Sequence, residues 1–322
     1  MKTLEGQEVV YSDHKNEQKG IALVIVLWML ALLSIIALAY SGMTRSENQL
    51  TSNVARSAKA RAIAEAGLWT AVHDLLRAPN DRRFSPDGTV VVLPIENKYK
   101  ALVSSQDESG KVDLNKASLE LLLGMIKSTE LDHEQSLHLV EAILDWRDKD
   151  NLQRVNGAET AVYEELDLPY GAKNGTFNSV EELMLVKGMT EEIFDQIKSG
   201  LTVHSMQARV RLSASPEGVL RGLPGMDESL VADMIAGRSN DATAIISVIP
   251  DITRPYIFAS GRGNIFTIVS NAKVEDVIAK LKVTLILKKT GNKPITILDW
   301  KEVAPTLTVF SEQDNLTDNV SL

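Results

Sequence analysis

The longest apolar run in the chain extends from Gly20 to Tyr40, and Ser34 is its only clearly polar side chain besides the final tyrosine. No charged residue interrupts it. About twenty apolar residues at ~1.5 Å each form a helix long enough to cross the ~30 Å hydrocarbon core of a bilayer. The run is longer than the apolar part of a secretory signal, which has about 7–15 residues. It therefore predicts a membrane-spanning helix at 21–41.

A helical pattern continues beyond this run. Small and apolar residues recur at steps of three and four, with charged residues between them and no proline before Leu76. This spacing predicts one long helix over about 21–77, whose second half is amphipathic. We expect a narrow stripe of this second half to bind a partner, and its members are Ala55, Ala58, Ala62, Ala66 and Trp69.

The remainder of the chain alternates between strand and helix patterns. Valine-rich alternation at 89–93 and 98–105, after a turn-rich segment, predicts a β-hairpin. Strand-like sequence returns at 256–260, 264–269, 281–288 and 295–300. Between the two groups of strands, a helical block covers about 107–252. Within it, Val112–Met125 and Val210–Met226 resemble each other, which indicates a weak internal duplication.

Residues 1–20 are polar, carry both signs of charge and end in Lys19-Gly20 directly before the apolar run. This order resembles the prepilins of the type IV pilin superfamily. The resemblance implies that 1–20 is a leader, cut by a prepilin peptidase between Gly20 and Ile21. Most pilins carry glutamate at the fifth position after the cut, where this chain has Ile25. The K-type minor pseudopilins of type II secretion systems characteristically lack that glutamate.

Residues 145–183 resemble the K-type signature most closely. They contain Asp145-Trp146-Arg147-Asp148-Lys149-Asp150, then Gly157-Ala158-Glu159, Tyr163, Tyr170, Asn174, and a helix start with Glu182-Leu183. The resemblance implies an α+β, pilin-like fold, in which a long N-terminal transmembrane and amphipathic helix packs on a small antiparallel sheet. A large all-helical domain of the helix-hairpin-helix or SAM-like type is inserted into the head. The expected segments are head strands at 78–106, the insertion at 107–252, later strands at 253–305 and a flexible tail at 306–322.

Three aspartates of the signature end a predicted helix and enter a loop that contains glycine. Several hard oxygens on a bendable loop suit Ca²⁺, which takes 6–8 oxygen ligands. The spacing is not that of an EF-hand, and the alternative is a solvated acidic loop in which Asp145 caps the helix or pairs with Arg147. The K-type resemblance favours a Ca²⁺ cofactor. The expected ligands are Asp145, Asp148, Asp150 and Glu159, with Glu164 and Asn156 as further candidates.

Composition and motifs argue against other functional classes. The chain has no cysteine, only scattered histidines and no catalytic combination of side chains, so we expect no enzyme. The alternative function is a membrane-anchored, competence-type DNA-binding protein, because the turns at Gly188-Met189-Thr190 and Gly225-Met226-Asp227 resemble helix-hairpin-helix turns. Both turns lack the second glycine and are followed by acidic residues, and the net charge is −9. We therefore expect no nucleic acid partner.

The resemblance also implies a function, a location and a set of partners. The chain would be a non-catalytic subunit at the pseudopilus tip, which helps to initiate assembly and to export folded proteins across the outer membrane. It would cross the bacterial inner membrane once, with its C-terminal domain in the periplasm. Its partners would be the lipid bilayer, the prepilin peptidase, the inner-membrane secretion platform and the minor pseudopilins of the I, J and H types.

Overall fold

The structure is a computed structural model that describes residues 18–78, 81–95, 98–237, 249–258, 263–288 and 293–303. The chain divides into two compact units, Met1–Ala58 and Lys59–Leu322. The expected tail at 306–322 and residues 1–17 of the expected leader lie outside the described residues.

A single helix, α1, extends from Gln18 to Leu76. It is the one helix within the described ranges that is long and apolar enough to cross a membrane, with a mean hydropathy of 3.0 over its most apolar window. Its apolar side chains from 21 to 43 are exposed, as illustrated by Trp28 at 76%. The expected long helix is therefore confirmed to within a few residues at each end.

The head contains a five-stranded antiparallel sheet in the order β1-β2-β7-β8-β9. The strands are β1 (Asp87–Ile95), β2 (Tyr99–Asp107), β7 (Ile265–Val274), β8 (Val277–Leu287) and β9 (Ile295–Glu302). Valine, isoleucine and leucine alternate on these strands, so one face of the sheet is apolar. The predicted hairpin and the three later strands of the sheet are present, and the pilin-like α+β class is confirmed.

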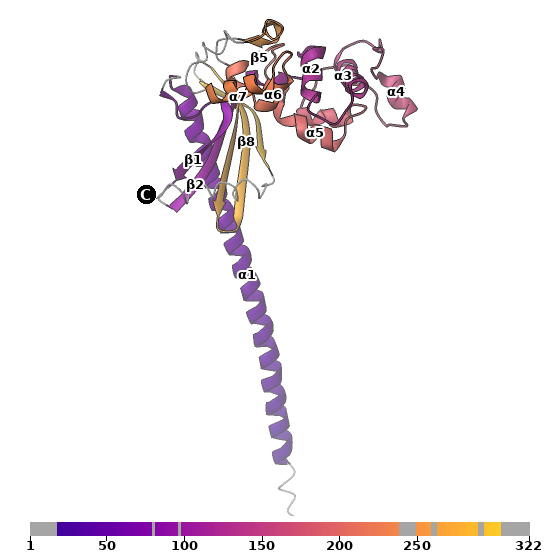
Figure 1. Ribbon diagram of the computed structural model, residues 1–322. Helices are drawn as coiled ribbons and strands as arrows, with labels where there is room; N and C mark the ends of the chain where they lie inside the picture. The colour runs from indigo at the N-terminus through magenta and orange to yellow at the C-terminus, as the bar shows by residue number, and fades with distance from the viewer. Residues whose placement is uncertain are drawn as a thin grey trace, which may run out of the picture. The chain divides into compact units, whose positions relative to one another are not determined.

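The second half of α1 covers the apolar face of the sheet (Figure 1). Close approach is possible because the helix presents small residues: a Cβ on Gly67 would lie 2.8 Å from the Cβ of Ala101 and 2.8 Å from Ser270 Oγ. The buried helix residues are Ala60, Ile63, Ala64, Leu68, Ala71, Val72 and Leu75. This buried face does not include any of the five residues of the predicted partner-binding stripe.

The inserted domain begins where β2 ends and returns at the start of the adjacent strand β7, since Asp107 and Phe266 are register partners. The Nζ of Lys59 lies 4.3 Å from the ring centroid of Tyr99, at the other end of β2. The C-terminal part of α1 lies near the insertion, because Asp74 accepts hydrogen bonds from the amides of Arg83 and Phe84 just before β1. The insertion therefore extends from the end of the sheet opposite to Lys59.

The insertion contains helices and very short strands. Its α-helices are α2 (Leu119–Ile126), α3 (His133–Arg147), α4 (Thr160–Glu165), α5 (Glu191–Ile197), α6 (Glu217–Gly222) and α7 (Glu228–Gly237). Its 3-10 turns are η3 (Glu108–Gly110), η4 (Val180–Leu185), η5 (Lys198–Gly200), η6 (Leu212–Ala214) and η7 (Arg254–Tyr256). Its strands are β3 (Val112–Asp113), β4 (Leu201–Thr202), β5 (Val210–Arg211) and β6 (Ile257–Phe258).

Two expectations for the insertion need correction. It is not entirely helical, because β3 pairs with β4 and β5 pairs with β6, both in parallel. The strand expected at 256–260 belongs to the insertion and not to the sheet of the head, since Ile257 pairs with Val210. An apolar alternation of a few residues does not specify its pairing partner. The insertion therefore extends beyond the end predicted for it at residue 252.

The internal duplication is visible in the fold. Each copy begins with a short strand (β3 or β5), continues into a helix (α2 or α6) and ends with the parallel partner of its first strand (β4 or β6). Helices α2 and α6 meet at a glycine of each copy, Gly124 and Gly222, where a Cβ on Gly124 would overlap the carbonyl oxygen of Gly222. The two copies therefore pack backbone against backbone.

We expect Gly124→Ala to lower the free energy of unfolding by about 1–3 kcal/mol, because the added methyl group forces the two helices apart. Gly218→Ala on α6 is the matched control, since a Cβ there meets nothing within 4 Å. The control should be neutral or slightly stabilising, as alanine is favoured over glycine in a helix. Denaturant unfolding of the full-length protein in detergent measures both changes. Equal stability of Gly124→Ala and the unmodified protein would contradict the close contact.

Candidate metal centre

Helix α3 positions the first two carboxylates of the predicted site. Its N-terminus is fixed by a capping box between Asp132 and Gln135, and Asp148 occupies the C-cap position. Near its end, Trp146 packs against Tyr163 and Phe177, with ring centroids 5.6 and 6.4 Å away. This aromatic cluster is part of the insertion's core, so the carboxylates at the end of α3 are held by a rigid element.

The loop after α3 folds back onto the same carboxylates. The backbone amide of Arg154 donates to Asp145 Oδ2 over 3.3 Å, and the amide of Asn156 donates to Glu141 Oε2 over 2.7 Å. Gly157 packs against the Asp145 carboxylate so closely that a Cβ at this position would overlap it. The chain then reaches Glu159, the residue before α4. The glycine of the sequence motif is thus required by a close approach.

Three carboxylates meet at this point. Oxygens of Asp145, Asp148 and Glu159 all lie within 4.8 Å of one another. Asp145 is completely buried and Glu159 is 4% exposed, whereas the side chain of Asp148 is 25% exposed. Negative charges at such distances repel one another strongly in a partly buried setting.

Several of these oxygens have no normal hydrogen-bond partner. They are Asp148 Oδ1 and both carboxylate oxygens of Glu159. Burial raises the pKa of Glu159, and the charges of Asp145, Asp148 and Asp150 raise it further. A buried carboxylate without a donor or counter-ion destabilises a fold, so this arrangement is costly unless a cation joins it.

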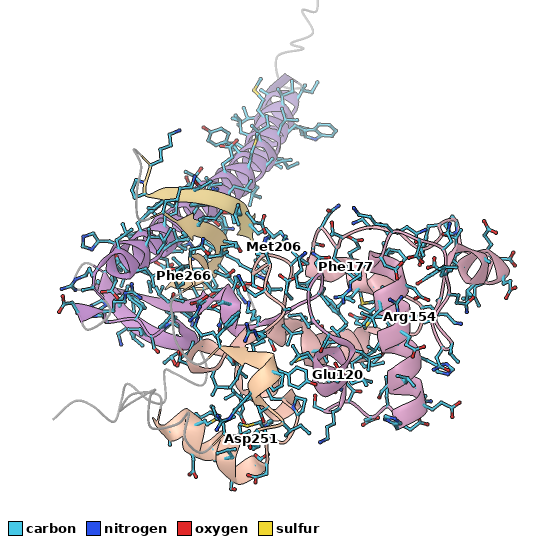
Figure 2. All side chains as sticks on the ribbon, turned by 90° about the horizontal axis from the view of Figure 1, so that it is seen from above. Glu120, Arg154, Phe177, Met206, Asp251 and Phe266 are labelled. Carbon is cyan, nitrogen blue, oxygen red and sulfur yellow. The ribbon has the colours of Figure 1, made fainter. Side chains whose placement is uncertain are left out.

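Arg154 supplies part of the missing positive charge. Its Nη1 donates to Asp145 Oδ1 and, over 2.6 Å, to Asp148 Oδ2. Burial lowers the pKa of Arg154, but its hydrogen bonds to Asp148 and Asp145 outweigh burial and raise that pKa overall. Figure 2 shows Arg154 in the part of the insertion that lies away from Phe266 and the sheet. Arg154 does not reach Glu159 by any hydrogen bond or ion pair seen among the described residues.

The donor set fits a hard divalent cation. Ca²⁺ prefers carboxylate oxygens that bind through one or both atoms, and water completes its shell. Asp145, Asp148 and Glu159 would hold such an ion, since they offer clustered oxygens, three of them unpartnered. The arrangement therefore has the chemistry of a cation site as well as that of a guanidinium-bridged acidic loop.

The structure separates the remaining expected ligands from this cluster. Asp150 is exposed, and its Oδ1 accepts the amide of Leu152. Glu164 is exposed on α4, and Asn156 is part of the loop but not of the carboxylate cluster. The pairing of Asp145 with Arg147, one form of the acidic-loop alternative, does not occur, because Arg147 donates to the carbonyl oxygens of Leu114 and Ala117.

Sequence reasoning missed Arg154, which takes the position expected of Arg147. The signal in the sequence is weak, because Arg154 lies nine positions after Asp145, beyond the end of α3 and within an irregular loop. A helical spacing argument therefore does not apply to the pair. Only the return of the loop after Asn151 brings the guanidinium between the two aspartates.

The predicted stripe of α1 is exposed in the structure. Ala55, Ala58 and Ala62 are exposed, Ala66 is partly buried, and Trp69 is 43% exposed with its ring 6.2 Å from that of Trp300. The stripe lies on the opposite side of the helix from the buried face, since positions advance by about 100° per residue. Its role in partner binding stays a prediction, as does cleavage between Gly20 and Ile21.

The two turns that resemble helix-hairpin-helix turns do have glycines with positive φ, +86° at Gly188 and +79° at Gly225. Carboxylates follow both glycines. The Asp227 carboxylate accepts the Leu230 amide, which lowers its pKa and keeps it negative where a nucleic acid phosphate would have to approach. At the first turn, the backbone amide of Lys187 already donates a hydrogen bond within the chain, to the hydroxyl of Tyr163.

An apolar N-terminal helix whose second half covers a small antiparallel sheet gives the chain a pilin-like fold. Two family models match it: "Type II secretion system (T2SS), protein K" over residues 100–206 and "PilX N-terminal" over residues 19–68. The chain is therefore similar to the protein K family of type II secretion systems over its central part, and to pilin-type N-termini over its apolar helix.

Known relatives show the same similarity. The type II secretion system protein K of Aeromonas hydrophila is 28% identical over 207 residues, which are 56% of this chain and 62% of the relative. The Klebsiella pneumoniae protein K is 27% identical over 203 residues, which are 56% and 61% of the two chains. The chain thus spans about three fifths of the length of these relatives.

A solved structure supports the fold. One chain of the crystal structure of the GspK-GspI-GspJ complex from enterotoxigenic Escherichia coli aligns with a TM-score of 0.54. The alignment covers 81% of this chain and 99% of that chain, at 15% sequence identity. At this identity the likeness establishes the shared fold.

The Glu159 carboxylate, whose oxygens have no hydrogen-bond partner of normal geometry, allows a direct test of whether its negative charge is compensated. In metal-free buffer, we expect Glu159→Gln to raise the free energy of unfolding by about 1–3 kcal/mol, because it removes an uncompensated buried charge. Glu164→Gln is the matched control and should change stability by less than about 0.5 kcal/mol, since Glu164 is exposed. Denaturant unfolding of the full-length protein with a chelator present measures both. A destabilised Glu159→Gln variant would show that the charge is compensated.

Proposed function

We propose that this chain is a non-catalytic subunit at the tip of a type II secretion pseudopilus, which helps to initiate assembly and to export folded proteins across the outer membrane. In this role α1 anchors the chain in the inner membrane, and the head lies in the periplasm. The minor pseudopilins of the I, J and H types and the inner-membrane secretion platform are its partners. The leader is removed by a prepilin peptidase between Gly20 and Ile21, which terminal sequencing of membrane-extracted protein would test.

The position of the insertion carries the tip proposal. It leaves the sheet between β2 and β7, at the end opposite to Lys59, and it contains more residues than the strands of the head. A helical filament requires every subunit to accept a copy on both sides. A head enlarged at this end can accept a subunit on the side of α1, but its insertion obstructs a copy stacked beyond it.

The residue at position 25 supports the same assignment. A charge in the bilayer is expensive unless it is paired. Ile25 offers no carboxylate to the N-terminal amine of another subunit, and the apolar run around it contains no acidic residue. A subunit at the top of the filament has no earlier subunit whose amine needs such a partner.

We also propose that the insertion binds Ca²⁺ through Asp145, Asp148 and Glu159. The support is their mutual distance of 4.8 Å or less, together with the unpartnered buried oxygens of Glu159. A cation here would join the end of α3 to the start of α4. Its role would be structural.

The tip assignment predicts one-directional association through the exposed stripe of α1. Ala62→Glu should abolish co-purification of the tagged full-length protein with I-type and J-type pseudopilins from detergent extracts, because it places a charge on a small-residue contact surface. Thr70→Glu serves as the control, because Thr70 is also exposed but lies about 80° around the helix from Ala62. Both variants should keep the melting midpoint of the unmodified protein. Immunogold label along the whole length of sheared filaments, in place of label at their ends, would overturn the tip assignment.

Calcium binding predicts a higher melting midpoint for the full-length protein in Ca²⁺ than in EDTA. A ligand that binds only the folded state at a hundredfold excess over Kd adds ~2.7 kcal/mol to the free energy of unfolding. Asp148→Ala should lose this increment, whereas Asp150→Ala should retain most of it, because Asp150 is outside the cluster. Identical midpoints in Ca²⁺ and EDTA would leave a guanidinium-bridged acidic loop as the correct description.

A further inference from the structure

We infer that Arg154 competes with the divalent cation for the Asp145–Asp148–Glu159 site, so that its guanidinium group sets the cation affinity of the loop. This inference rests on the proposed calcium site and concerns a residue outside the expected ligand set. In the absence of the cation, the guanidinium stabilises the carboxylates of Asp145 and Asp148. Binding of the cation releases it.

The first argument is the overlap of ligand atoms. Arg154 Nη1 contacts Asp145 Oδ1 and Asp148 Oδ2, and both carboxylates belong to the group of three whose oxygens lie within 4.8 Å of one another. A cation coordinated by these carboxylates needs the oxygens that the guanidinium occupies. One planar cation and one spherical cation cannot share the same lone pairs at coordination distance.

The second argument is that the guanidinium can leave without unfolding the loop. The side chain of Arg154 is 37% exposed, so a path to solvent exists. Its backbone is held independently, because its amide donates to Asp145 Oδ2 and its carbonyl accepts the amide of Gly157 over 3.1 Å. Rotation of the side chain alone therefore exposes the oxygens, while the carboxylates stay in place.

The third argument is charge. One guanidinium neutralises only part of the negative charge of three carboxylates, and the Glu159 oxygens have no hydrogen-bond partner of normal geometry. A divalent cation carries twice the charge and would contact Glu159 as well as the two aspartates. The guanidinium therefore lowers the affinity of the site but does not close it, since the cation makes an interaction that Arg154 lacks.

The test is calcium titration calorimetry on full-length protein in detergent, with Arg154→Ala as the variant. Removal of the competitor should lower the Kd for Ca²⁺ about tenfold or more, as expected for loss of charged hydrogen bonds to two carboxylates. In EDTA the variant should melt below the unmodified protein, and added Ca²⁺ should recover the difference. A side chain with a merely supporting role would weaken both stability and calcium binding.

Arg221→Ala is the matched control for net charge. Arg221 also bridges two carboxylates, Glu217 at 2.6 Å and Glu228 at 2.7 Å, and its side chain is 46% exposed. Its removal changes the total charge equally and should leave the Kd unchanged. If Arg154→Ala does not fold in EDTA, Arg154→Lys replaces it, because the lysine ammonium ends a side chain one atom shorter, reaches the two carboxylates less well than Nη1, and should still tighten binding.

The possible results separate this inference from the calcium proposal. An unchanged or higher Kd in both Arg154 variants overturns the competition and leaves the calcium site standing. Binding by the Arg154 variants alone supports the competition but refutes calcium binding by the unmodified chain. If neither the unmodified protein nor the variants bind Ca²⁺, both ideas are wrong.

Discussion

The buried carboxylate of Asp107 joins the inserted domain to the head, and the rest of the fold depends on this junction. It accepts the amide and hydroxyl of Ser109, where the insertion begins, and the amide of Gly263, where the chain returns to the sheet. Arg211 Nε, at the start of the second copy, lies 3.7 Å from the same carboxylate. Its burial is tolerable because both carboxylate oxygens accept hydrogen bonds. One side chain thus connects the two ends of the insertion at the adjacent strands β2 and β7.

The helix that enters the head carries two stripes of small residues, and its sequence separates them by angle. Alanines at 60, 64 and 71 face the sheet, while the stripe around Ala58 and Ala62 faces outward. Small residues on the inner face allow the helix backbone to lie close to β2 and β7, as it does at Gly67. Small residues on the outer face leave space for another helix to approach equally closely. The outer stripe is the surface that the proposed partner would contact, whereas a helix with a polar outer face would offer only the contact with the sheet.

Local patterns predicted the long helix, the hairpin, the later strands and the duplication, because each depends on neighbours in sequence. The same patterns could not tell which alanine stripe of α1 is buried, since both repeat at helical spacing. Strands of two residues, such as β3 and β6, are too short to show any period. At the candidate site, the carboxylates were predicted through their motif, but the pairing of Arg154 with Asp145 depends on the return of an irregular loop.

That loop differs physically from the rest of the insertion. Leu152 and Val155 are 77% and 94% exposed, so the large apolar side chains of the loop contribute almost no burial, and only the small Ala158 joins the core. Its shape is maintained by polar contacts: the Asp145 carboxylate, the Glu141 carboxylate and the backbone around Gly157. Because polar contacts dominate, the proposed cation would change the order of the loop by neutralising its carboxylates. A hydrophobic loop would keep its shape in the presence or absence of an ion, whereas in this loop the proposed cation would couple its binding to the connection between α3 and α4.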